Sequence, residues 1–161
     1  MKGKDIALAA GLAMMGLIVP SAQAVQVNFQ GGLIEAIPCT ISDGELIEVD
    51  FNDMVIRDID GVRYSKPIPY KIDCSAAGAV RLSFRATGSS FDIGVVQTSS
   101  PDLGIRITSN GVPISVLPDA YLTEIDVQSP PQLMAVPVVN PAQPPSPGAF
   151  TARAMLLAEY Q

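Results

Sequence analysis

The chain has 161 residues, with 10 lysines and arginines against 16 aspartates and glutamates, and it has no histidine and no tryptophan. A net charge of −6 argues against nucleic acid and against an anionic membrane surface as partners. Because histidine is the commonest general base and metal ligand, its absence disfavours most catalytic and metal sites.

The first 24 residues have the pattern of a secretory signal peptide. Two lysines precede a fourteen-residue apolar run, 6–19, and a small-x-small cleavage signal, "AQA", ends at Ala24. A membrane anchor is the alternative, but fourteen apolar residues are too few to span a bilayer comfortably. We therefore expect export and cleavage, which leaves 161 − 24 = 137 residues, the size of one domain.

The exported chain begins with "VQVNFQGGL", which alternates as a β-strand does. Such a strand either pairs within its own domain or is added to another chain, and the alternation is the same in both cases. We call its apolar or small side the donor row: Val25, Val27, Phe29, Gly31 and Leu33.

Two cysteines follow, Cys39 and Cys74. In an oxidising compartment a lone pair predicts one disulfide, with two free buried thiols as the alternative. Their spacing is far from CxxC, so neither a zinc site nor a redox motif is indicated.

Short alternating segments with turn residues between them make up the middle of the chain. We predict strands in "LIEVDF" (46–51), "IPYKIDC" (68–74) and "VRLSFRAT" (80–87). Within 103–116, Asn110-Gly111 predicts a hairpin turn between two strands.

Two more strands are predicted in "LTEIDV" (122–127) and "QLMAVPVV" (132–139). Proline cannot donate to a strand ladder, so Pro67, Pro69 and Pro137 place their segments at edges or bulges. With no helical period beyond the signal peptide, the pattern predicts an all-β sandwich.

The chain ends in "GAFTARAMLLAEYQ", a predicted strand that continues to the penultimate residue. It either closes a sandwich or leaves an edge for another chain. The preceding segment, "NPAQPPSPG" (140–148), predicts a stiff surface loop. We call the apolar side of the last strand the C-terminal row: Phe150, Ala152, Ala154, Leu156, Ala158 and Tyr160.

Catalytic and metal motifs are weak or missing. "RDIDG" is similar to part of a calcium loop, but Ile56 and Pro67 would occupy its first and twelfth positions, so an acidic turn is expected. No histidine, GxSxG or SxxK is present to activate a serine. We expect no enzyme activity, no cofactor, no metal and no small-molecule substrate.

The chain resembles the minor pilins of the chaperone–usher pathway, members of the type 1 and P pilus family that builds adhesive fimbriae on Gram-negative bacteria. A signal peptide precedes a short alternating extension with glycine, then "PCTI" with Cys39, then Cys74 thirty-five residues later. Tyr160 is penultimate and Gly148 is fourteenth from the C-terminus, the spacing associated with chaperone recognition in this family. The resemblance spans the whole exported chain.

The resemblance implies an incomplete immunoglobulin-like β-sandwich over residues 39–161, with six strands and the seventh missing. Residues 25–38 would form a donor-strand extension whose donor row fills a groove in a neighbouring pilin subunit. The C-terminal row, with Gly148, would line this subunit's own groove. A periplasmic fimbrial chaperone would fill that groove first, and the next subunit's extension would replace it at the outer-membrane usher. The chain would pass through the periplasm to the cell surface as part of a fimbrium.

The short extension and "PCTI" favour an adaptor near the fimbrial tip. The alternatives are a terminator that anchors the fibre, a host-binding adhesin-type subunit, or a self-contained secreted sandwich. An adhesin of this system carries a second domain ahead of the pilin domain, and 137 exported residues leave no room for one.

Overall fold

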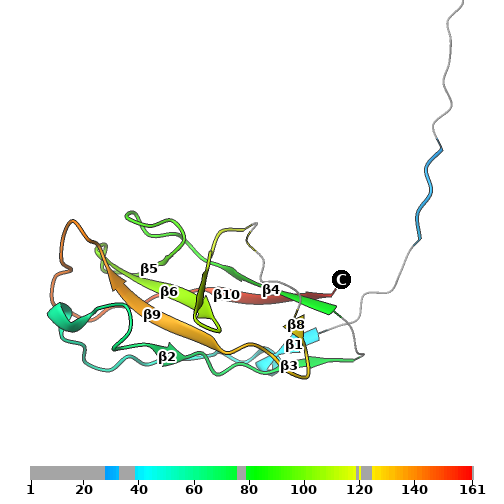
Figure 1. Ribbon diagram of the computed structural model, residues 1–161, viewed down its shortest axis with the longest axis horizontal. Helices are drawn as coiled ribbons and strands as arrows, with labels where there is room; N and C mark the ends of the chain where they lie inside the picture. The colour runs from blue at the N-terminus through cyan, green and yellow to red at the C-terminus, as the bar shows by residue number, and fades with distance from the viewer. Residues whose placement is uncertain (1–27, 33–38, 76–78, 119, 121–124, 161) are drawn as a thin grey trace, which may run out of the picture. The chain divides into compact units, whose positions relative to one another are not determined.

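The computed structural model describes residues 28–32, 39–75, 79–118, 120 and 125–160 (Figure 1). The chain divides into two units, Met1–Ile34 and Glu35–Gln161. In the first unit, residues 28–32 are exposed and belong to no strand, and the predicted signal peptide lies outside the described residues. No helix in the described part of the chain is long and apolar enough to cross a bilayer.

The larger sheet of the second unit is built around a central pair of antiparallel strands, β6 (Leu103–Ser109) and β9 (Leu133–Val139). Its order is β2-β9-β6-β5, with β2 at Lys66–Pro67 and β5 at Val96–Gln97. The strand β7 (Val112–Ile114) also pairs with β6. The predicted hairpin joins these two strands, because Asn110 and Gly111 have φ values of 49° and 83°, as a tight primed turn needs.

A second sheet has three strands in the order β10-β4-β8. They are β10 (Met155–Tyr160), β4 (Ala79–Arg85) and β8 (Ile125–Asp126). A short ladder pairs β1 (Cys39–Ile41) with β3 (Ile72–Cys74), and Cys39 lies opposite Cys74 in a disulfide. The predicted disulfide is therefore confirmed. Two single 3₁₀ turns, η1 (Ser42–Gly44) and η2 (Ile56–Asp58), complete the elements.

The hydrophobic core lies between the two sheets. Alternation along β4 buries Val80, Leu82 and Phe84, as the sequence predicts. They pack in one cluster with buried residues of β6 and β9, which makes the two sheets a sandwich. The expected all-β sandwich is confirmed, and its sheets are open.

Pro137 lies in a central strand and not in an edge strand. Leu133 accepts a hydrogen bond from the N–H of Ile68, on the β2 side of β9. Alternate residues of a strand direct their backbone groups to the same edge, and Pro137 lies four residues after Leu133, so its nitrogen also faces the β2 side. Since β2 pairs only with Met134 and Ala135, no ladder bond is lost at Pro137.

Three predicted strands differ from the structure. The predicted strand 68–74 is shortened to β3, Ile72–Cys74. The segment 46–51 is assigned to no strand, and the last strand begins at Met155, after Phe150. The alternation in 46–51 is nevertheless real, because Ile47, Val49 and Phe51 are half-buried between exposed neighbours.

The Cys39–Cys74 disulfide closes a loop with a sequence separation of 35. Replacing both cysteines by serine is expected to lower the free energy of unfolding by about 3–4 kcal/mol, because the unfolded chain gains conformational freedom. Urea unfolding of the exported chain measures the change. The control is Val62→Ala at a side chain that is 74% exposed, which should shift stability by less than about 0.5 kcal/mol. Equal midpoints for the double variant and the native chain would contradict the expectation.

Candidate functional site

The last strand, β10, lies at the end of its sheet and pairs with β4 alone among the described strands. The pairing runs from Met155 opposite Arg85 to Tyr160 opposite Val80. Glu159 lies 3.8 Å from the guanidinium of Arg85, an exposed ion pair that contributes little. In the described part of the chain, the other side of β10 pairs with no strand and is an unpaired backbone edge, which we call the open edge.

The register determines which residues direct backbone groups to the open edge. Ala86, which follows β4, donates its N–H to the carbonyl of Val116 and not toward β10. Neighbouring residues of a strand direct their N–H and C=O groups to opposite edges. The odd-numbered residues of β4 and β10 therefore bond to each other. Leu156 and Ala158 direct their N–H and C=O groups to the open edge.

The same two residues have side chains on the core face. Leu156 and Ala158 are half-buried and pack against the core cluster beside Phe150. Met155, on the outer face, is 64% exposed. The open edge thus combines unpaired backbone groups with apolar side chains that the domain covers only in part.

The extended segment 46–51 lies along the same side of the domain. At one end β1 lies beside β10, and at the other the rings of Phe51 and Phe150 are 6.1 Å apart. Val49 and Phe51 pack against the core cluster, yet both are only half-buried. Within the described residues, segment 46–51 makes no backbone–backbone hydrogen bond. Sequence alternation detected this strand-like segment but not its missing partner, because alternation carries no information on pairing.

The predicted rows occupy different environments. Gly148 is exposed with a positive φ of 151°, and Ala152 and Ala154 are exposed ahead of β10. In the donor row, Phe29 is 93% exposed and Gly31 has open space around it. The other donor-row residues, Val25, Val27 and Leu33, lie outside the described residues.

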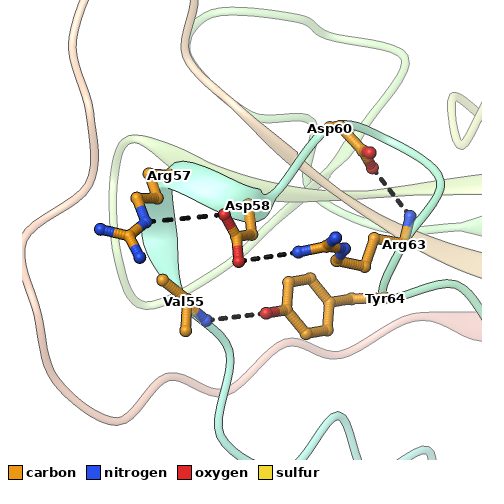
Figure 2. Close-up of polar contacts among 6 residues, drawn as sticks. All are labelled: Val55, Arg57, Asp58, Asp60, Arg63 and Tyr64. Atoms are coloured by element: carbon orange, nitrogen blue, oxygen red, sulfur yellow. Dashed lines mark hydrogen bonds and ion pairs between the residues drawn. The ribbon is translucent and has the colours of Figure 1, made fainter.

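The "RDIDG" segment forms a turn held by its own side chains (Figure 2). Asp58 forms ion pairs with Arg63 at 2.8 Å and with Arg57 at 3.7 Å. The N–H groups of Arg63 and Val62 donate to Asp60 Oδ1 at 2.8 and 2.9 Å. These backbone bonds, that of Arg63 first, hold the pKa of Asp60 below its ordinary value. Both carboxylates therefore have structural partners.

A family model described as "Fimbrial protein" matches residues 27–161. The fimbrial-like protein YfcQ of Escherichia coli (strain K12) is 31% identical over 140 residues, which cover 84% of this chain and 86% of YfcQ.

Two solved structures share the fold. The P pilus adaptor subunit PapF superposes with a TM-score of 0.56 at 22% identity, covering 77% of this chain and 96% of PapF. A subunit from the rod of a chaperone–usher pilus gives a TM-score of 0.60 at 20% identity, covering 91% of this chain and all of that one.

The contribution of Asp60 to stability is expected to depend on pH. Because its pKa is lower in the folded chain, this contribution is fully present above the ordinary value of 3.8 and is lost as the pH falls through the folded pKa. Asp60→Ala should lower the urea midpoint at pH 7, and the difference from the native chain should shrink below pH 3.8. Asp60→Asn, which keeps an acceptor oxygen, should lose less at pH 7. A difference of the same size at pH 3 and at pH 7 for Asp60→Ala would contradict this assignment.

Proposed function

Because the chain belongs to the fimbrial protein family, we propose that it polymerises by donor-strand exchange. It is a structural subunit of a pilus and not an enzyme, and its place is the extracellular fimbrium, where it interacts with other pilin subunits. The exchange mechanism, the order of partners and the position in the fibre are the proposal.

The open edge of β10 is the observation that carries the proposal. Leu156 and Ala158 offer both backbone bonding groups and partly covered apolar side chains to a strand added from another chain. Chaperone–pilin donor-strand complementation is an established case of such strand addition. An added strand would pair with β10 and cover the half-buried residues Val49, Phe51 and Phe150.

The donor row would supply the apolar side chains of the strand that is added to the open edge. Val25, Val27, Phe29 and Leu33 are four apolar residues that would share one side of the added strand. At about 1.5–3 kcal/mol for each fully buried side chain, they set an upper bound of about 6–12 kcal/mol before ordering costs. Gly31, which has no side chain, lets the two backbones approach closely at its position in the row. Phe29 is exposed, so it is available to another molecule.

The order of partners is the one that the family resemblance implies. The open edge would be covered by a periplasmic chaperone first and then, at the outer-membrane usher, by the next subunit's extension. The C-terminal row and Gly148 would make the chaperone contacts. An edge that accepts a strand favours an adaptor or stalk subunit over a terminator, and the short extension and "PCTI" favour the adaptor.

Proline at position 158 tests strand addition, because it removes an N–H that faces the open edge and leaves the β4 ladder intact. A labelled peptide of residues 25–33 is titrated into the exported chain, 25–161, and binding is followed by fluorescence anisotropy. Ala158→Pro should weaken peptide binding by about ten- to hundredfold, since one backbone bond is lost and its acceptor is left unpaired.

The control is Ser146→Pro, at an exposed position of the proline-rich loop 140–148 and outside the C-terminal row. It should bind the peptide as the native chain does. Undiminished binding by Ala158→Pro, or no binding by the native chain, would rule out strand addition at this edge.

The adaptor position predicts a specific pattern on assembled fimbriae. Immunogold labelling of this subunit in electron micrographs should mark fibre tips, about one cluster per fibre. Continuous labelling along the shaft would identify a stalk subunit, and labelling confined to the cell surface would identify an anchor.

A further inference from the structure

A shallow polar pocket lies ahead of β10, where the C-terminal segment crosses the end of β5. Its volume is about 330 Å³, and it opens widely to solvent. The C-terminal segment contributes residues 151–153 to the lining. The rest comes from Thr87, which follows β4, and from Gln97, Thr98 and Ser99 at the end of β5.

Hydrogen bonds hold the segments that line the pocket together. Ser99 donates its N–H to the carbonyl of Thr151 at 2.8 Å, and Thr151 donates its N–H to Ser99 Oγ at 3.0 Å. Thr98, only 5% exposed, shares its single hydroxyl proton between the carbonyls of Ser100 and Leu103. Gln97 donates its N–H to the carbonyl of Thr87 at 2.8 Å. The backbone of the pocket floor is therefore fixed by hydrogen bonds before any ligand binds.

Four polar side chains around this floor remain free. Thr87, Gln97, Thr151 and Arg153 are exposed, and none of their side chains has a hydrogen bond or ion pair within the described part of the chain. Two hydroxyls, an amide and a guanidinium supply both donors and acceptors to one concavity.

The charge of the lining is opposite to that of the chain. The chain has 16 acidic residues, yet the pocket is lined by one arginine and by no aspartate or glutamate. A guanidinium presents two parallel donors that match a carboxylate. No aromatic residue is present in the lining, so stacking on a neutral sugar ring is not available.

We propose that this pocket binds a monosaccharide unit that carries a carboxylate. Arg153 holds the carboxylate, while Thr87, Gln97 and Thr151 bond to ring hydroxyls. The volume is at the small end of ligand sites, which suits a single sugar unit. The pocket residues precede the open edge, which begins with β10 at Met155, but the lining shares Ala152 with the C-terminal row. The sugar is therefore expected to bind when no chaperone covers that row.

The test is a nitrogen-15 NMR titration of the exported chain with three probes at equal ionic strength: D-glucuronate, D-glucose and acetate. Glucuronate should produce saturable shifts at the amides of Ser99 and Thr151, with a dissociation constant on the order of 1 mM. Glucose and acetate should each bind at least about tenfold more weakly, because each lacks half of the recognised chemistry. Arg153→Gln should weaken glucuronate binding about tenfold or more, and Thr151→Val by a smaller factor.

The control is Arg57→Gln, which removes a cation with an 87% exposed side chain from η2. It should leave glucuronate binding unchanged. Equal losses for Arg57→Gln and Arg153→Gln would mean non-specific charge attraction and would overturn the proposal. So would acetate binding as tightly as glucuronate, or an acidic peptide binding more tightly, since the pocket would then recognise a carboxylate without the sugar. The absence of saturable shifts would overturn it as well.

Discussion

The fold depends on one strand, β10, whose alternate side chains pack on the core while only one edge of its backbone is paired. Leu156 and Ala158 pack on the core cluster, while their N–H and C=O groups face the open edge. Water can satisfy those groups, but it cannot cover the apolar side chains beside them. An added strand would bond to these backbone groups and cover the apolar side chains at the same time.

The C-terminal segment also connects the two sheets. Residues 151 and 152 pair with the chain after β5, and from Met155 the strand pairs with β4. Between these pairings only Arg153 and Ala154 are left without a ladder, and both are exposed. The open edge is therefore fixed at its beginning by hydrogen bonds to the larger sheet, which holds β10 in register before any partner binds.

The sequence predicted those features that follow from alternation and from compartment. Val80, Leu82 and Phe84 could be assigned to the core because every second residue of a strand shares a face. The disulfide followed from two cysteines in a chain that the sequence predicts to be exported. Pairing could not be predicted, because the same alternation serves a bonded strand and an unbonded one. Segment 46–51 has the pattern without the partner, and Ala152 and Ala154 continue the C-terminal row without reaching the core. No sequence pattern indicated the polar pocket, because the residues that line it are far apart in the chain.

The disulfide has a mechanical consequence. Cys39 opens β1, and its sulfur is bonded to Cys74 at the end of β3. Tension on the chain ahead of Cys39 therefore enters a covalent bond before it reaches any hydrogen bond of this three-residue ladder. Without that bond the ladder would peel apart one rung at a time from its loaded end. With it, the pull is shared between two strands, and the domain resists as a whole.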